Sequence, residues 1–171
     1  MLGYTMMPGK GDTNLLLASF AERVQHSGRS VCGCVQPTNI NPTAKNAGGM
    51  IIRTLPAGDD ILISQHLGPG SGGCRLDQGA LEQAVASVER AYSAKCDLLL
   101  INKFGKHEAQ GRGFRDLIGR AVHDRVPVLV GLNALNERAF FDFADGLQER
   151  VQPDLDALLR WFDQTVELSI A

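Results

Sequence analysis

The residues with the clearest chemical potential lie between Leu98 and Arg115, in the sequence LLLINKFGKHEAQGRGFR. The apolar run Leu98–Ile101 is typical of a buried parallel strand. An amide, an imidazole, a carboxylate and four cations follow it: Asn102, His107, Glu108, Lys103, Lys106, Arg112 and Arg115. Open α/β sheets bind ligands beyond the carboxyl ends of their strands, so this cluster is a candidate site. The alternative is a solvated loop followed by an amphipathic helix.

The residue types in this cluster suggest an anion site with a base beside it. Arg112 and Arg115 stand three residues apart at an expected helix start, where they can hold an anion together with the helix dipole. Glu108, next to His107, is placed to act as a general base, so both are candidate catalytic residues. The competing interpretation is a set of surface salt bridges, which contribute little.

A second candidate is the first loop of the chain, Gly9–Thr13, which has the sequence GKGDT and lies between an expected strand and an expected helix. It is called the first loop below. Gly9 and Gly11 let backbone N–H groups turn inward, and Thr13 supplies a hydroxyl at the helix start. A phosphate-binding loop also has a lysine immediately before that hydroxyl, but Asp12 stands there. A carboxylate about 4 Å from a phosphate oxygen repels it by roughly 1 kcal/mol in water, and a lysine attracts it by a similar amount. Asp12 is alternatively an N-cap residue.

A third candidate is the glycine-rich segment GPGSGG at residues 68–73, which formally matches the dinucleotide pattern G-x-G-x-x-G. In that fingerprint the helix opens within the glycines and an acid ends the next strand. Here the expected helix opens only near Asp77, and Asn102 follows the next strand. A loop that carries Arg75 toward an anion at the helix start fits better. Its further candidate ligand-binding positions are Gly70, Gly72 and Gly73.

Hydrophobic periodicity predicts the elements that position these loops. Strands are expected at Leu2–Met7, Ser30–Gln36, Met50–Leu55, Ile61–His66, Leu98–Ile101 and Pro127–Leu132. Helices are expected at Thr13–Ser27, Asp77–Ala94, Gly111–Asp124, Ala134–Ala144 and Asp154–Val166. The alternation predicts one α/β domain over residues 1–171, with three layers, a mostly parallel sheet and an inserted β-hairpin at 50–66.

Composition limits the classes of partner. The 171 residues are 44% hydrophobic and 21% charged, as in ordinary globular domains. A net charge of −2 gives no general reason to expect nucleic acid or an anionic membrane surface. Without an apolar run of spanning length or a secretion signal, the expected location is the cytoplasm. The four cysteines are then expected to be reduced, with Cys32, Cys34 and Cys96 as small buried hydrophobes rather than metal ligands.

The chain resembles an uncharacterised bacterial family, a domain of unknown function associated with molybdenum transport. The resemblance covers most of the chain and is sharpest in ISQHLGPGSGGCRLD (Ile63–Asp77) and NKFGKHEAQGRGFR (Asn102–Arg115). More distantly, it is similar to the small P-loop nucleoside triphosphatases. Their strand-end motif is roughly Asp-Glu-Ile-Gly-Lys-Met-Glu with a later Phe, and residues 102–108 and Phe114 occupy that pattern.

The second resemblance implies a P-loop fold with phosphate bound between the first loop and Asn102. Three positions depart from the family: its metal-side acid is Asn102, the neighbouring acid is Lys103, and its phosphate lysine is Asp12. Phosphoryl transfer depends on positioning and charge neutralisation, so these losses remove most catalysis. The resemblance therefore implies a degenerate P-loop domain in which Mg²⁺ lacks a carboxylate ligand, and the cofactor stays unknown.

The leading hypothesis is a regulatory module that binds a nucleotide or another phosphate-like oxyanion with little or no hydrolysis. A first alternative is a weak nucleoside triphosphatase or other enzyme, with Glu108 or His107 as the base and Arg75 and Arg112 on an anionic substrate. A second is handling of molybdate or a related oxyanion. A third is a structural partner, as a homodimer or beside a transporter-related protein, through the aromatics at 140–143 or 161–162. Core packing is the alternative use of those aromatics.

Overall fold

A mixed sheet organises the chain in the computed structural model, which describes all residues except 10, 38–48, 66–75, 94 and 171. The described residues form seven strands in the order β4-β3-β2-β5-β6-β1-β7. Their bounds are β1 Leu2–Thr5, β2 Val31–Val35, β3 Ile51–Leu55, β4 Asp60–Leu62, β5 Leu98–Ile101, β6 Val128–Gly131 and β7 Gln148–Arg150. The parallel part runs from β2 to β7, and β3 and β4 are antiparallel. The expected mostly parallel sheet with an inserted hairpin is confirmed.

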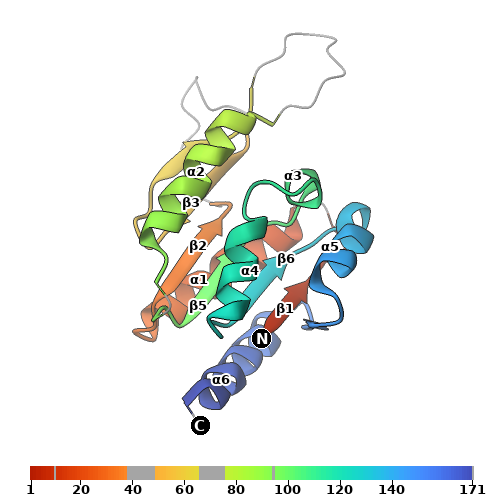
Figure 1. Cartoon of the computed structure of the whole chain (residues 1–171). Coiled ribbons are helices and arrows are strands. Elements are labelled where there is room, and N and C mark those ends of the chain that lie inside the picture. The colour runs from red at the N-terminus through yellow and green to blue at the C-terminus, as the bar shows by residue number, and fades with distance from the viewer. Residues whose placement is uncertain (10, 38–48, 66–75, 94, 171) are drawn as a thin grey trace.

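Helices cover both faces of this sheet (Figure 1). They are α1 Asp12–His26, α2 Gln78–Ala91, α3 Lys106–Ala109, α4 Arg115–His123, α5 Glu137–Ala144 and α6 Leu155–Ile170, with a short 3-10 helix η1 at Ala134–Asn136. One buried cluster joins the sheet to α2, α4 and α5, and a second joins it to α1 and α6. The expected three-layer arrangement follows from this division.

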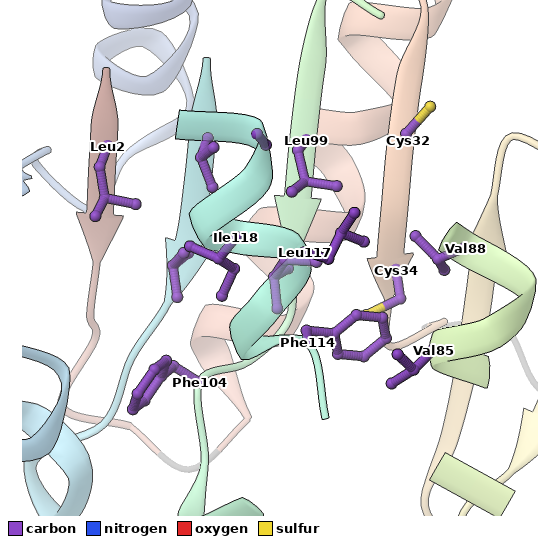
Figure 2. Close-up of a cluster of buried hydrophobic side chains, with 14 of the residues drawn as sticks. Leu2, Cys32, Cys34, Val85, Val88, Leu99, Phe104, Phe114, Leu117 and Ile118 are labelled. Atoms are coloured by element: carbon purple, nitrogen blue, oxygen red, sulfur yellow. The ribbon is translucent and has the colours of Figure 1, made fainter. Parts of the chain in front are cut away.

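The alternating side chains of the strands supply both layers. On β5, Leu99 and Ile101 pack in the cluster of α2 and α4, whereas Leu98 and Leu100 pack in the cluster of α1. All four are fully buried, which explains why this strand has a continuous apolar sequence. Figure 2 shows Leu117 and Ile118 of α4 extending toward the sheet beside Leu99.

Three local expectations were wrong. The helix expected from Gly111 to Asp124 begins only at Arg115, as α4, and the short helix α3 precedes it in a segment expected to be a loop. Asp12 is the first residue of α1, and its N-cap is Gly11 with φ of +92°, so Asp12 does not cap the helix. Strand β7 was not expected, because its three residues are polar and it pairs only at the edge, with β1.

Other expectations from single residues are confirmed. Asp77 caps α2, its side chain accepting a hydrogen bond from the Ala80 N–H at 2.9 Å. Cys32, Cys34 and Cys96 are buried thiols, and Cys74 lies outside the described residues. Aromatic residues of α5 and α6 pack in the core, with Phe140 fully buried and Phe162 2% exposed. None of the described helices is both long and apolar enough to cross a bilayer.

Candidate functional site

Three residues form a row across the carboxyl edge of the sheet, below the first turn of α1. Thr5 of β1 pairs with Gly131 of β6. Ile101, the last residue of β5, pairs with Val130, and Asn102 follows Ile101 in the chain. A β-carbon added to Gly131 would lie 3.3 Å from Asn102 Oδ1 and 3.5 Å from Thr13 Cγ2. The absence of a side chain at Gly131 therefore lets Asn102 and Thr13 approach each other. The resemblance to the P-loop nucleoside triphosphatases implies that a phosphate binds between these two parts of the chain, and this binding stays a prediction.

The polar side chains in this row lack hydrogen-bond partners. Asn102 is 7% exposed, and neither its Oδ1 nor its Nδ2 has a partner in the described part of the chain. Thr5 Oγ1 is likewise buried and unpaired there. Leaving a buried polar group unsatisfied costs about 1–3 kcal/mol, and native proteins do so rarely. Unpaired donors and acceptors below a helix N-terminus are the features of a polar ligand site.

The backbone fixes Asn102 in this position. Its N–H donates to Cys34 O at 3.2 Å, and the N–H of Phe104 donates to Gly131 O at 3.0 Å. The Cys34 thiol donates to Asn102 O at 3.8 Å. Burial raises the pKa of the Cys34 thiol to about 12, so this thiol is a neutral neighbour of the site. The amide is therefore held by the sheet and not by contacts of its own side chain.

The first loop directs its own carboxylate against its backbone. The Met7 N–H donates to Thr13 Oγ1 at 3.0 Å, which fixes the hydroxyl at the start of α1. A β-carbon at Gly9 would lie only 1.7 Å from Asp12 Oδ2, so the Asp12 carboxylate lies directly over Gly9. The negative charge is therefore on the loop itself, where a phosphate-binding loop has a lysine.

Glu108 and His107 hold together the turn between α3 and α4. Glu108 is 3% exposed, its Oε2 accepts the Gly105 N–H at 2.9 Å, and its Oε1 accepts the Phe114 N–H at 3.2 Å. His107 is buried, with Nε2 2.7 Å from Oε1 of Glu82 on α2. Sequence reasoning missed Glu82, because an exposed glutamate on a helix has no local sign of a partner 25 residues away.

The two arginines have partners within their own surroundings. Arg112 contacts the side chains of Gln78, at 3.4 Å, and Gln110, at 3.1 Å. Arg115 donates to Glu108 O at 3.3 Å, and its guanidinium carbon lies 4.3 Å from the centre of the Phe143 ring. Among the described contacts, none joins either arginine to the first loop. The anion cradle expected from these arginines at the start of their own helix stays a prediction.

A cavity of about 430 Å³ opens beside the carboxyl end of β5. It is bordered by Asn102, by the exposed Lys103 and Lys106, and by apolar residues of β3 and α2. The remaining predicted ligand-binding residues, Gly70, Gly72, Gly73 and Arg75, lie outside the described residues.

The side chains around Thr13 include one carboxylate, that of Asp12, and the neutral amide of Asn102. Within the described ranges, no group of three or more His, Cys, Asp or Glu residues can hold a metal ion. The side-chain oxygen that meets Thr13 across Gly131 is the neutral amide oxygen of Asn102. Mg²⁺ in nucleotide sites is usually held by one or two carboxylates together with substrate phosphates and water.

Comparison with known proteins agrees with this architecture. The crystal structure of THEP1 from the hyperthermophile Aquifex aeolicus matches with a TM-score of 0.63 and 19% identity, over 98% of both chains. This likeness shows that the two chains share one fold. A protein of Bradyrhizobium diazoefficiens named molybdenum import ATP-binding protein ModC 2 is 34% identical over 154 residues. The match spans 90% of this chain but only 17% of that protein. Residues 2–161 match the family described as protein of unknown function (DUF2478), and the chain belongs to that family.

Proposed function

We propose that this protein binds a phosphate group of a nucleotide below the N-terminus of α1, with little or no hydrolysis. The observation that carries the proposal is the buried, unpaired amide of Asn102, which faces Thr13 across Gly131. Its Nδ2 can donate to a phosphate oxygen, while the first N–H groups of α1 supply further donors and a favourable dipole. The P-loop fold and the relative named as ATP-binding favour a nucleotide as the source of that phosphate.

Weak or absent hydrolysis follows from the charges around the phosphate. Acceleration of phosphoryl transfer requires cations that neutralise charge on the transferred group. Here Asp12 places a carboxylate on the loop, and Asn102 is neutral where a metal-binding acid is expected. The proposed role is therefore regulatory, in that bound nucleotide changes the state of the domain without being consumed.

The test is calorimetric titration of the full chain with ATP and GTP, each with and without Mg²⁺, together with an assay of phosphate release. Wild-type protein is expected to bind at least one nucleotide and to release phosphate no faster than the buffer blank. Asn102→Leu keeps the side-chain size but removes the hydrogen-bonding groups. Binding is therefore expected to weaken by about ten- to hundredfold, in line with ~1.5–3 kcal/mol for a hydrogen bond to a charged group.

A stability measurement makes the same variant more informative. Because Asn102→Leu removes two unsatisfied buried atoms, it is expected to raise the melting temperature of the ligand-free protein while weakening binding. Gln148→Leu is the matched control, because the amide oxygen of Gln148 is also buried and unpaired in the described chain but lies opposite Leu2 at the amino end of β1, and it is expected to leave nucleotide affinity unchanged. Absence of heat with both nucleotides, or equal affinity in Asn102→Leu and wild type, contradicts the proposal.

Free oxyanions form a separate arm of the titration, because a helix N-terminus also accepts tetrahedral anions. Molybdate and sulfate are expected to bind more weakly than the nucleotide, since they lack the base and sugar. Saturable binding of molybdate by a protein that ignores both nucleotides would assign the site to a free oxyanion instead.

A further inference from the structure

The cavity beside β5 opens at the carboxyl edge of the sheet, next to the proposed phosphate site. Its walls include Ile52, Leu81 and Phe114, which belong to the buried cluster of α2 and α4. Leu17, one turn into α1 from Thr13, belongs instead to the cluster of α1 and α6. The apolar walls therefore lie on the α2 and α4 side of the sheet, whereas Asn102 borders both the cavity and the proposed phosphate site.

The walls of this cavity are largely apolar. Ile52, Ile63, Leu81 and Phe114 all border it and are each no more than 9% exposed. Figure 2 shows Phe114 extending from the start of α4 toward α2, where Val85 lies. A volume of about 430 Å³ is within the range of small-molecule pockets. Such walls favour an apolar ligand, because burying apolar surface contributes about 25 cal/mol per Å².

Positive charge stands at one side of the same cavity. Lys103 and Lys106 border it and are exposed, and within the described chain neither forms an ion pair. The carboxylate of Glu108 also borders the cavity, but both of its oxygens accept backbone hydrogen bonds. His107 has Glu82 as its partner. The two ammonium groups are therefore the charged groups free to meet a ligand.

We propose that this cavity binds a small amphiphilic anion, with its apolar body against Ile52, Leu81 and Phe114 and its anionic head at Lys103 and Lys106. The apolar walls would bind the apolar body of the ligand, and the adjacent lysines would bind its anionic head. Water solvates the exposed lysines, so the ion pair selects the orientation of the ligand, and burial of its apolar body supplies most of the affinity. The proposal does not depend on nucleotide binding.

Octanoate is the probe, and butyrate and 1-octanol are the matched comparisons. Titration of the full chain is expected to show saturable octanoate binding at a single site. Butyrate is expected to bind more than tenfold more weakly, because each buried CH₂ contributes substantially to transfer from water. Octanol is expected to bind about fivefold more weakly than octanoate, because it lacks the charge.

Variants test the contribution of the lysines and that of the apolar walls separately. The exposed double variant Lys103→Gln/Lys106→Gln is expected to reduce octanoate affinity to that of octanol, whereas Lys95→Gln is the control and leaves it unchanged. Leu81→Phe narrows the cavity and is expected to weaken both probes at least fivefold. ATP affinity is measured on Leu81→Phe and is expected to stay at the wild-type value.

Three results would overturn the inference. Absence of saturable octanoate binding would show that the cavity does not bind amphiphilic anions, whether or not the protein binds ATP. Equal affinity for octanoate and octanol, unchanged in the lysine variant, would show that the lysines do not bind an anionic group. Equal loss of ATP and octanoate binding in Leu81→Phe shows one shared site instead of two.

Discussion

Asp12 determines the sign of the charge on the loop that faces the proposed phosphate. Its Oδ2 would lie 1.7 Å from a β-carbon at Gly9, so the carboxylate is against the loop and not directed away from it. Asp12→Asn removes this charge with little change in size. Asp12→Lys reverses the charge and places a lysine immediately before Thr13, as in a phosphate-binding loop.

The expected gain follows from Coulomb's law. Asp12 is exposed, so the value for water applies, about 1 kcal/mol for two unit charges ~4 Å apart. Removing the repulsion is then expected to tighten ATP binding about fivefold, and adding the attraction brings the total to about thirtyfold, since ~1.4 kcal/mol is tenfold. Both gains are expected to shrink at high salt, because mobile ions screen exposed charges.

Calorimetric titration of wild type, Asp12→Asn and Asp12→Lys with ATP, at low and physiological salt, measures these steps. Asp163→Lys, which changes an exposed aspartate on α6 by the same two charges, is the control for net charge. Equal ATP affinity in all three loop proteins would refute the reasoning, because a phosphate at this loop must respond to the charge. An equal gain in Asp163→Lys would assign the effect to net charge alone.

Stability and its dependence on pH give further tests. Phe104→Ala removes a fully buried ring and is expected to lower the free energy of unfolding in urea by about 3–5 kcal/mol; a loss below about 1 kcal/mol contradicts the packing. Gly131→Ala places a β-carbon 2.7 Å from Leu17 Cδ1 and is expected to cost about 1–3 kcal/mol, so unchanged stability argues against the close approach. Partial burial acts to raise the pKa of Asp97, but hydrogen bonds from Ser30 and Arg29 and the charge of Arg29 together outweigh it and hold the pKa below its ordinary value of 3.8. The resulting stabilisation is present above that value and is lost as pH falls through the lower folded pKa, so Asp97→Asn is expected to flatten this loss in acid titrations of stability; an unchanged profile contradicts it.

Local patterns in the sequence were sufficient for most elements of this fold. The continuous apolar run at β5 predicted a strand buried on both faces, because only a covered parallel strand has no polar side. Asp77 predicted the start of α2, because a side-chain cap acts within one helical turn. Helix α3 and the late start of α4 were not predicted, because the turn between the two helices depends on Glu108 accepting the N–H groups of Gly105 and Phe114.

The sequence by itself also placed the first loop and Asn102 at the same edge of the sheet, because parallel strands end together at their carboxyl ends. Only the tertiary structure decided how they meet. β6 lies between β1 and β5, and Gly131 leaves the space through which Asn102 faces Thr13. Tertiary structure likewise gave Glu108 its backbone partners and placed the lysine-bordered cavity beside Asn102. Periodicity and capping act over a few residues, whereas strand order and side-chain partners depend on the packing of segments far apart in the chain.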